Sequence, residues 1–289
     1  MAFEVRALNT KDCFGDSRTA MPMFAAIMRH APDLAVFSEA YSAQAADSNA
    51  LSSTVDRFRS EGYAVTHGLY KDSDGRADSH GIMVISRLGG RGKLVGMDSR
   101  NAVQLEGLAD PATARRFDFI GAHLDDRHAS TRNSQLRTLL KRVVNPVRPT
   151  IIAGDLNASH GDDRAAPLIR AGGSIIHKFG TIEPADYHAL SGPAKAAKLH
   201  RRIGSIGQRA HGMIDDGTMR RLAYAGFRDA DPNHRPTMSV GGLALQIDHI
   251  MVSREFNHTV PHRPAKIKHT DHRMAGATVA FFPQAAKSK

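Results

Sequence analysis

Segment 151–157 ends an apolar run in two polar side chains of the kinds that handle phosphate and metal ions. Residues 151–153 (Ile-Ile-Ala) predict a buried strand, and we expect Gly154 to turn the chain. Asp155 and Asn157 follow two residues apart, which points both side chains the same way. An Asp at a strand end can bind Mg²⁺ or orient a water, and the Asn can hold a phosphoryl oxygen. Alone the pattern is weak, because Asp-x-Asn also occurs in turns, where both side chains cap backbone N–H groups.

Carboxylate, amide and imidazole side chains recur near the ends of other predicted strands or inside them. They are Asn9 after 3–8, Glu39 after 34–37, His123 after 117–122, Asp248 within 244–252, and Asp271 and His272 before 276–281. These are the side-chain types with which a metal-dependent phosphoesterase binds metal, positions water and neutralises phosphate.

The elements that carry these residues alternate between strands and amphipathic helices. Apolar periodicity predicts helices over 18–30, 49–61 and 131–144. Further strands are predicted over 64–67, 81–86, 93–97 and 102–105. Clustered strands with helices between others indicate two packed sheets with helices outside.

No repeat and no Pro-, Gly- or Ser-rich linker divides the chain, so we expect a single domain over 1–289. Within it, 173–212 carries six Lys and Arg against two acidic residues, which predicts a basic surface insertion. One interpretation places this insertion beside the active site, where it grips flanking phosphates. The other is a solvated loop without substrate contact.

Charge makes nucleic acid the leading substrate class. Thirty-nine Lys and Arg face 29 Asp and Glu, a net charge of +10, and such an excess attracts polyanions. A solubilising surface, or attraction to anionic lipid, is the alternative explanation. Trp is absent and there are 5 Tyr, so phosphate contacts are expected more than base stacking on aromatic rings.

Cysteine usage and hydropathy favour a soluble cytoplasmic protein. Cys13 is the only cysteine, which excludes an intrachain disulfide. The N-terminus lacks the apolar core of a secretory signal, and no segment is apolar over the length that spans a bilayer. Export by a route without a signal peptide stays open, and no protein partner is evident.

Taken in order, these segments resemble the endonuclease/exonuclease/phosphatase superfamily, which includes deoxyribonuclease I-like enzymes and abasic-site endonucleases. The resemblance runs from Asn9 to His272 and rests on three motifs, Gly154-Asp155-Leu156-Asn157, Ile247-Asp248-His249-Ile250 and Asp271-His272. It implies an α/β fold, a four-layer α/β/β/α sandwich of two mainly antiparallel sheets flanked by helices. The active site would lie at one edge of the two sheets.

The resemblance assigns a role to each matching catalytic position. Asp155 and Asn157 match the pair that orients the attacking water and the phosphoryl group. His123 matches the histidine that steadies the phosphate or assists the leaving oxygen, and Asp248 and His272 match a hydrogen-bonded carboxylate–imidazole pair. Because an Asp that accepts an imidazole N–H stabilises the imidazolium, Asp248 makes His272 either a better base or a better phosphate clamp.

Glu39, Asn9 and Asp271 are the implied metal ligands, with Mg²⁺ as the expected ion and Mn²⁺ as its substitute. Glu39 matches the metal-binding glutamate, and Asn9 matches a first-strand asparagine that helps to hold metal or phosphate. Asp271 matches an acidic residue assigned to metal binding or to support of the site. Mg²⁺ prefers a few carboxylates plus waters and substrate phosphate, which suits a site with few protein ligands.

Two departures from the family pattern concern the metal side of the site. Ser38-Glu39 stands where Gln-Glu is usual, and Thr10-Lys11 follows Asn9 where abasic-site endonucleases tend to have a second acidic residue. The second departure argues against that subgroup and against a strongly bound second metal.

Several other polar residues have weaker assignments. Arg100 is either a substrate-binding, phosphate-contacting arginine or an ordinary turn residue. Structural pairing is expected of Arg132 and Gln135, a supporting role of Asp229 and Thr237, and helix capping of Asp215-Asp216. We expect His80, His128 and His249 not to be ligands.

Three functions compete. The leading one is a Mg²⁺-dependent nuclease, most simply an endonuclease, that hydrolyses phosphodiesters in DNA or RNA. The alternative keeps the reaction and changes the substrate to a phosphoinositide, sphingomyelin or another small phosphoester. A non-catalytic nucleic-acid-binding module is disfavoured, because every expected catalytic position is filled. The sequence leaves open DNA or RNA, endo- or exonucleolytic cutting, and one metal or two.

Overall fold

The computed structural model describes residues 2–42, 48–69, 80–97, 100–126, 128–159, 216–240 and 243–281. The expected insertion 173–212 lies outside these residues, as does Asp215, so their expected roles stay predictions. In the part of the chain that is described, no helix is both long and apolar enough to cross a bilayer.

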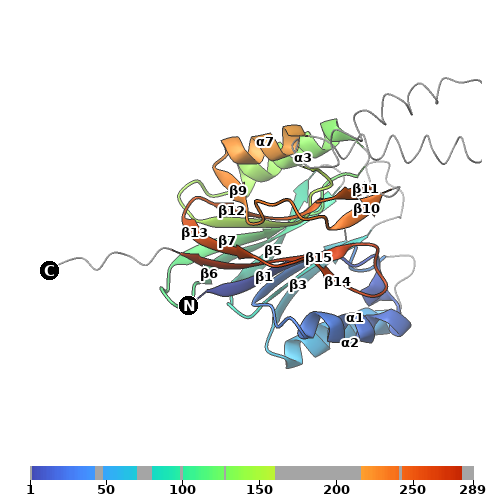
Figure 1. Cartoon of the computed structure of the whole chain (residues 1–289). Helices are drawn as coiled ribbons and strands as arrows, with labels where there is room; N and C mark the ends of the chain where they lie inside the picture. Colours follow the sequence, from blue (N-terminus) through green and yellow to red (C-terminus); the bar gives the residue numbers. More distant parts are fainter. Residues whose placement is uncertain are drawn as a thin grey trace, which may run out of the picture.

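Two sheets form the centre of the structure (Figure 1). The first has the order β13-β15-β1-β2-β4-β3, with β14 also paired to β15. Its strands are β1 (Phe3–Asn9), β2 (Leu34–Ser38), β3 (Ala64–Leu69), β4 (Gly81–Ser86), β13 (Phe256–Pro261), β14 (Ala265–Lys266) and β15 (Arg273–Phe281).

The second sheet has the order β5-β6-β7-β8-β12-β9. Its strands are β5 (Arg91–Met97), β6 (Arg100–Ala109), β7 (Arg116–Gly121), β8 (Thr150–Asp155), β9 (Phe227–Asp229) and β12 (Asp248–Ser253). A separate hairpin pairs β10 (Met238–Val240) with β11 (Leu243–Leu245). Pairing is antiparallel except for β1 with β2 and β7 with β8.

Helices cover the outer face of each sheet. α1 (Ser17–Met28) and α2 (Ser48–Ser60) lie on the first sheet, beside the short 3₁₀ helix η1 (Cys13–Gly15). α3 (Ala129–Arg142) and α7 (Asp216–Tyr224) lie on the second (Figure 1). The expected four-layer α/β/β/α sandwich is therefore confirmed, and α1, α2 and α3 fall where helical periodicity predicted them.

Alternation along the strands produces the layers. On β1, Phe3, Val5 and Ala7 face the apolar cluster between the sheets, while Leu8 joins the cluster under α1 and α2. On β8, Ile151 faces the same central cluster and Ile152 faces the one under α3 and α7. Both strands are thus buried on both faces, which fixes their register and the position of the residues at their ends.

Two expectations about local structure were wrong. Gly154 does not turn the chain, because β8 continues through it to Asp155. It is a glycine for another reason: its φ is +136°, and a Cβ there would collide with the carbonyl oxygen of Ala122.

The pattern over 244–252 is not one strand. It breaks at Gln246 and Ile247 into β11 and β12, so Asp248 opens a strand and does not lie inside one. The hydroxyl of Thr237 accepts the N–H groups of Ile247 and Asp248, at 3.1 and 3.0 Å, and these bonds replace ladder pairing at the break.

Gly154→Ala is expected to lower the free energy of unfolding by about 3 kcal/mol or more, because backbone strain and a backbone clash combine. Gly226→Ala is the control, since Gly226 also has positive φ, +87°, but has open space around it. Its loss should be about 1–2 kcal/mol, from the left-handed conformation alone. Urea unfolding measures both, and equal losses would show that the contact with Ala122 does not constrain β8.

Candidate active site

Strand directions bring six of the expected site residues to one edge of the sandwich. β1 is parallel to β2 and β7 to β8, so these four strands end side by side within their sheets. β12 is antiparallel to β8 and β15 to β1, so both begin at the same edge. A hydrogen bond of 3.0 Å between Asn9 and Asp155 joins the edges of the two sheets. The gathered residues are Asn9, Glu39, His123, Asp155, Asp248 and His272.

Asp155 is the centre of this group and is 1% exposed. Its Oδ2 accepts the Asn9 amide N–H at 3.0 Å, and its Oδ1 accepts the Asn157 backbone N–H at 3.0 Å. Its own N–H donates to the hydroxyl of Ser38, at the end of β2, at 3.3 Å. Burial, followed by repulsion from Asp248, raises the pKa of Asp155 to about 7.

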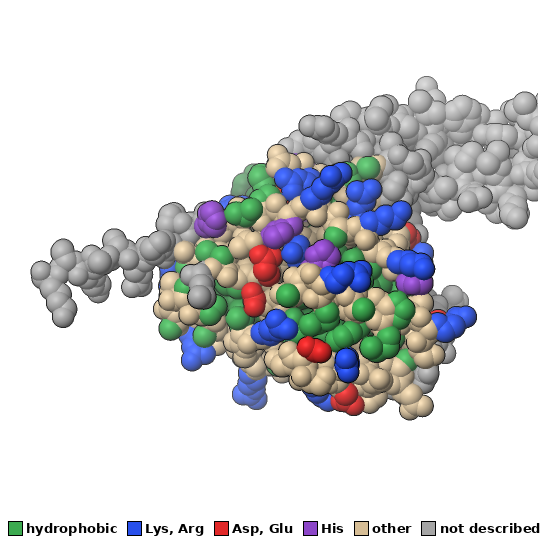
Figure 2. Space-filling model, turned by 60° about the horizontal axis from the view of Figure 1, so that its bottom comes forward, with side chains coloured by type: hydrophobic (Ala, Val, Ile, Leu, Met, Phe, Trp, Pro, Cys, Tyr) green, Lys and Arg blue, Asp and Glu red, His purple; other side chains and the backbone are tan. Residues whose placement is uncertain are grey.

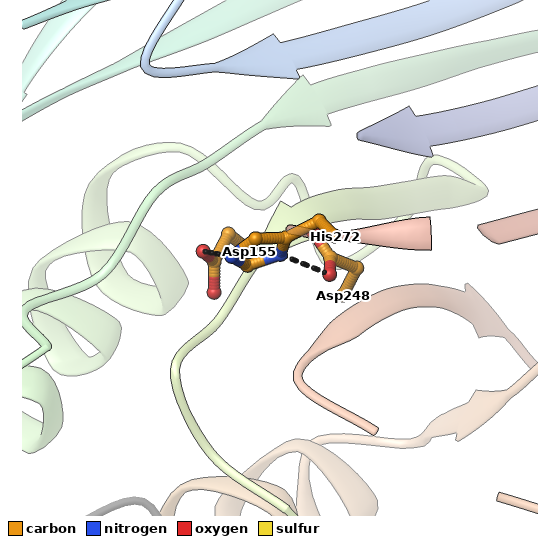
Figure 3. Close-up of side chains that lie close together, drawn as sticks. All are labelled: Asp155, Asp248 and His272. Atoms are coloured by element: carbon orange, nitrogen blue, oxygen red, sulfur yellow. Dashed lines mark hydrogen bonds and ion pairs between the residues drawn. The ribbon is translucent and has the colours of Figure 1, made fainter. Parts of the chain in front are cut away.

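Asp248 and His272 form the expected carboxylate–imidazole contact (Figure 3). Nδ1 of His272 lies 2.8 Å from Oδ2 of Asp248, and its Nε2 lies 4.0 Å from Oδ2 of Asp155. Burial opposes protonation of the ring, but the charge of Asp248, aided by Asp155, outweighs it and raises the pKa of His272 to about 10. The ring is therefore an imidazolium at neutral pH.

Two threonines fix the backbone of this pair. Thr237 holds the start of β12 as described above, and Thr270 accepts the His272 N–H at 3.1 Å. The Thr270 hydroxyl also donates to the carbonyl oxygen of Asn9 at 2.8 Å, which ties the segment before β15 to the end of β1. The supporting role expected of Thr237 thus has a definite contact behind it.

His123 lies between two carboxyl groups. Its Nε2 is 3.8 Å from Oδ2 of Asp155 and 3.9 Å from Oε1 of Glu39, both too long for hydrogen bonds. Burial, with smaller contributions from Arg100 and other nearby cations, holds its pKa well below the ordinary value of 6.5. The site therefore contains one neutral imidazole and one charged imidazole.

The donor set fits a bound cation. The described residues give the Glu39 carboxyl group no hydrogen bond. Nε2 of His123 lies 3.9 Å from its Oε1, but this ring is neutral and leaves the carboxylate charge uncompensated. Oδ1 of Asp248 is buried and has no hydrogen-bond partner among the same residues. Ligand atoms of Asp155, Asp248 and His272 also lie within 4.8 Å of one another, but a divalent ion could bind there only in place of the His272 proton, because an imidazolium has no lone pair to offer. Unneutralised negative charge is what a hard cation relieves.

Asn157 is placed by a turn. β8 ends at Asp155, and Asn157 has a φ of 49°, so alternation along a strand no longer decides where its side chain points. Its amide nitrogen donates to the carbonyl oxygen of Leu124 at 2.9 Å. This bond ties the turn to the segment that carries His123, and the phosphate-holding role stays a prediction.

Arg100, Arg132 and Gln135 all form hydrogen bonds with residues 125–126, just after His123. Arg100 opens β6 instead of lying in a turn, and its guanidinium donates to Asp126 at 3.0 Å. Arg132 donates to the carbonyl oxygen of Asp125 at 2.9 Å, and Gln135 accepts the Asp125 N–H at 2.8 Å. Arg132 and Gln135 therefore have the structural pairing that was expected, each with the backbone of Asp125. Substrate binding by Arg100 remains a prediction.

Sequence reasoning missed two further contacts of histidines. Nδ1 of His80 lies 2.9 Å from Asp12, and this bond raises the pKa of the ring. His249 lies 2.7 Å from Oδ2 of Asp229 through Nδ1 and 2.7 Å from the carbonyl oxygen of Ala158 through Nε2. Both of those partners accept hydrogen bonds, so both ring nitrogens of His249 carry protons. Neither contact had a local signal, because each spans 20 or more residues of chain.

The Asp248–His272 pair predicts a specific pH dependence. A folded pKa near 10 lies above the unfolded value of about 6.5, so the pair stabilises the fold below about pH 6.5 and loses that contribution as pH rises through 10. In metal-free protein, Asp248→Asn should bring the pKa of His272 to about 6.5 or lower, measured by NMR titration. Asp12→Asn is the matched control and should lower the pKa of His80 alone. An unchanged His272 titration in Asp248→Asn contradicts this origin of the charge.

The chain is similar to known proteins in its family sequence pattern and in its fold. The model of the Endonuclease/Exonuclease/phosphatase family matches residues 13–272. No curated protein matches the chain. Among solved structures, an endonuclease/exonuclease/phosphatase from Beutenbergia cavernae has a TM-score of 0.60 at 17% identity, over 97% of this chain and 72% of that one.

Two further solved structures share the fold. The catalytic domain of human Nocturnin, solved with a bound sulfate anion, has a TM-score of 0.54 at 15% identity, over 97% of this chain and 95% of that one. An AP endonuclease from Archaeoglobus fulgidus has a TM-score of 0.52 at 13% identity, over 96% and 99% of the two chains. At these identities the likeness is one of fold.

Proposed function

This chain belongs to the endonuclease/exonuclease/phosphatase family, and from that premise we propose that it is a divalent-metal-dependent phosphodiesterase that hydrolyses DNA or RNA. Members of the family are in general hydrolytic phosphoesterases that depend on a divalent metal. The observation that carries the proposal is the convergence on Asp155 of Asn9, His123 and His272, with Glu39 open beside them.

The contacts divide the work among the side chains. Asp155, with a pKa of about 7, is balanced at neutral pH between holding and releasing a proton, as a base that deprotonates water must be. Asn9 and Asn157 orient its two oxygens. We assign the water-activating role to Asp155 for this reason.

His272 has the charge for the phosphate-clamp role and not for that of the base. Its Nδ1 is engaged by Asp248, and its protonated Nε2, 4.0 Å from Oδ2 of Asp155, could donate to a phosphoryl oxygen. A cation preorganised at this point stabilises charge that develops in the transition state. We assign to His123, which is neutral and buried, the contact with the phosphate or the leaving oxygen, since it adds no charge there.

Glu39 is the residue that would hold the metal, with Asn9 as its neighbour. A bound divalent cation would neutralise the phosphate and polarise its oxygens. Glu39 has a φ of 45°, and its carbonyl oxygen accepts the N–H of Asp12 at 2.6 Å and the hydroxyl of Thr10 at 3.0 Å. The loop after β1 therefore anchors the backbone that carries the Glu39 side chain.

Net charge supports nucleic acid as the substrate. The chain carries +10, and on the face shown in Figure 2 the Lys and Arg side chains are spread out instead of gathered in one patch. A field of this kind raises the encounter rate with any polyanion and carries no sequence information. DNA and RNA are thus equally supported, as are endo- and exonucleolytic cutting.

The small phosphoesters are the competing substrate class, since they need the same chemistry. Incubation of the protein with plasmid, single-stranded DNA and RNA, in Mg²⁺, Mn²⁺ or EDTA, separates the classes when phosphoinositide, sphingomyelin and a chromogenic phosphodiester are run beside them. We expect cleavage of nucleic acid that stops in EDTA. Turnover of the lipids or small esters alone would transfer the proposal to that class.

Metal dependence is expected to run through Glu39. Glu39→Gln keeps the shape of the side chain and removes its charge, so kcat/KM should fall about a hundredfold or more while the protein stays folded. Glu106→Gln is the control, because Glu106 on β6 pairs with Lys93 on the neighbouring edge strand β5. Steady-state cleavage assays measure both variants. Full activity of Glu39→Gln in EDTA would remove the metal mechanism.

A further inference from the structure

Lys11 forms an ion pair at the metal side of the site. Its ammonium nitrogen lies 3.1 Å from Oδ2 of Asp271, the acidic residue next to His272. The pair connects the loop after β1 with the loop before β15, and its two residues are 260 positions apart in the sequence. Asp271 was expected to bind metal, so its existing cation bears directly on how many metal ions the site can hold.

The backbone keeps the base of the Lys11 side chain in place. Lys11 and Asp12 both lie in the left-handed region, with φ of 50° and 61°, a backbone conformation that residues other than glycine adopt at a cost in free energy. The Lys11 N–H donates to Oδ1 of Asn9 at 3.1 Å, and the Asp12 N–H donates to the carbonyl oxygen of Glu39 at 2.6 Å. Lys11 is therefore anchored between the two residues nearest the expected metal.

The carboxyl groups of the site differ in what neutralises them. His272 pairs with Asp248, and Asn9 donates to Asp155. Burial of Asp271 acts to raise its pKa, but the hydrogen bond from Lys11 and nearby positive charge lower it overall, so Asp271 is ionised and matched by the ammonium. The described residues give the Glu39 carboxyl group no hydrogen bond: His123 Nε2 lies 3.9 Å away, and the charge of Glu39 adds to that of Asp12 in raising the pKa of His80.

We propose that Lys11 is the built-in counter-cation of Asp271 and restricts this site to one divalent ion, held at Glu39. This inference rests on the metal dependence proposed above and adds the number of ions. Lys11 and Asp271 are about half exposed, at 58% and 49%, so their attraction contributes little to folding. The ammonium of Lys11 would instead repel a second divalent ion at Asp271 and weaken the binding of that ion by roughly tenfold or more.

Titration of metal-free protein with Mn²⁺, followed by EPR of the free ion and by calorimetry, counts the bound ions without any turnover. Wild type should bind one ion, and Glu39→Gln should lose it. Lys11→Met keeps the length of the side chain and removes its charge, so a second, weaker ion should bind. In Lys11→Met/Asp271→Asn that second ion should disappear.

Three further variants test whether the number of bound ions depends on the Lys11–Asp271 pair in particular. Lys93→Met removes the ammonium of another half-exposed ion pair, Lys93–Glu106, three strands from β8 on the edge strand β5, and should still bind one ion. Asp271→Asn alone should keep one ion, with Kd changed by less than about threefold at physiological salt. Lys11→Asn, which tolerates the left-handed backbone, repeats the test should Lys11→Met fold poorly.

The outcomes separate this inference from the proposed function. Two ions in wild type, or one ion with unchanged affinity in both Lys11 variants, would overturn the role of Lys11 and leave metal dependence standing. Loss of the single ion in Asp271→Asn would show that Asp271 is a ligand, which also overturns it. No bound ion in wild type would overturn this inference and the metal dependence together.

Discussion

Two acidic side chains, Asp155 and Asp248, lie opposite each other on β8 and β12, and both are buried. Like charges so placed repel strongly, and burial adds the cost of removing each from water. The structure relieves that cost with a cation and with fixed donors. His272 carries the cation, while Asn9 and the Asn157 backbone donate to Asp155. These contacts fix Asn9, Asn157 and His272 around the two carboxyl groups.

This arrangement also separates the ionisation states that phosphodiester hydrolysis requires. A charged imidazole at His272 and a neutral one at His123 lie 4.0 and 3.8 Å from the same carboxylate oxygen, Oδ2 of Asp155. Asp155 is raised to a pKa of about 7 by burial and by Asp248, which suits proton transfer at neutral pH. The ammonium nitrogen of Lys11 lies 3.1 Å from Asp271, whereas the described residues give the Glu39 carboxyl group no hydrogen bond.

Sequence reasoning found the fold and the central residues because both leave local signals. Apolar alternation over 3–8 and the continuous apolar runs 34–37 and 151–153 located the strands that lead to Asn9, Glu39 and Asp155. Strand ends are where side chains of a sandwich meet at an edge. The break at Gln246 went unseen because Thr237 supplies the bonds that replace strand pairing there. Lys11 was noticed only as a missing acid, since its partner Asp271 lies 260 residues away. Contacts of that span depend on the folded sheets and have no periodicity of their own.

The central claim is that Asp248 and His272 act as one unit in hydrolysis. A double-mutant cycle tests it most directly, with kcat/KM measured for Asp248→Asn, His272→Ala and the double variant on the phosphoester that the protein hydrolyses best. The double variant should be no slower than the slower single variant, within about threefold, because each change alone disables the pair. Losses that multiply in the double variant would show that the two residues act independently and would contradict the account.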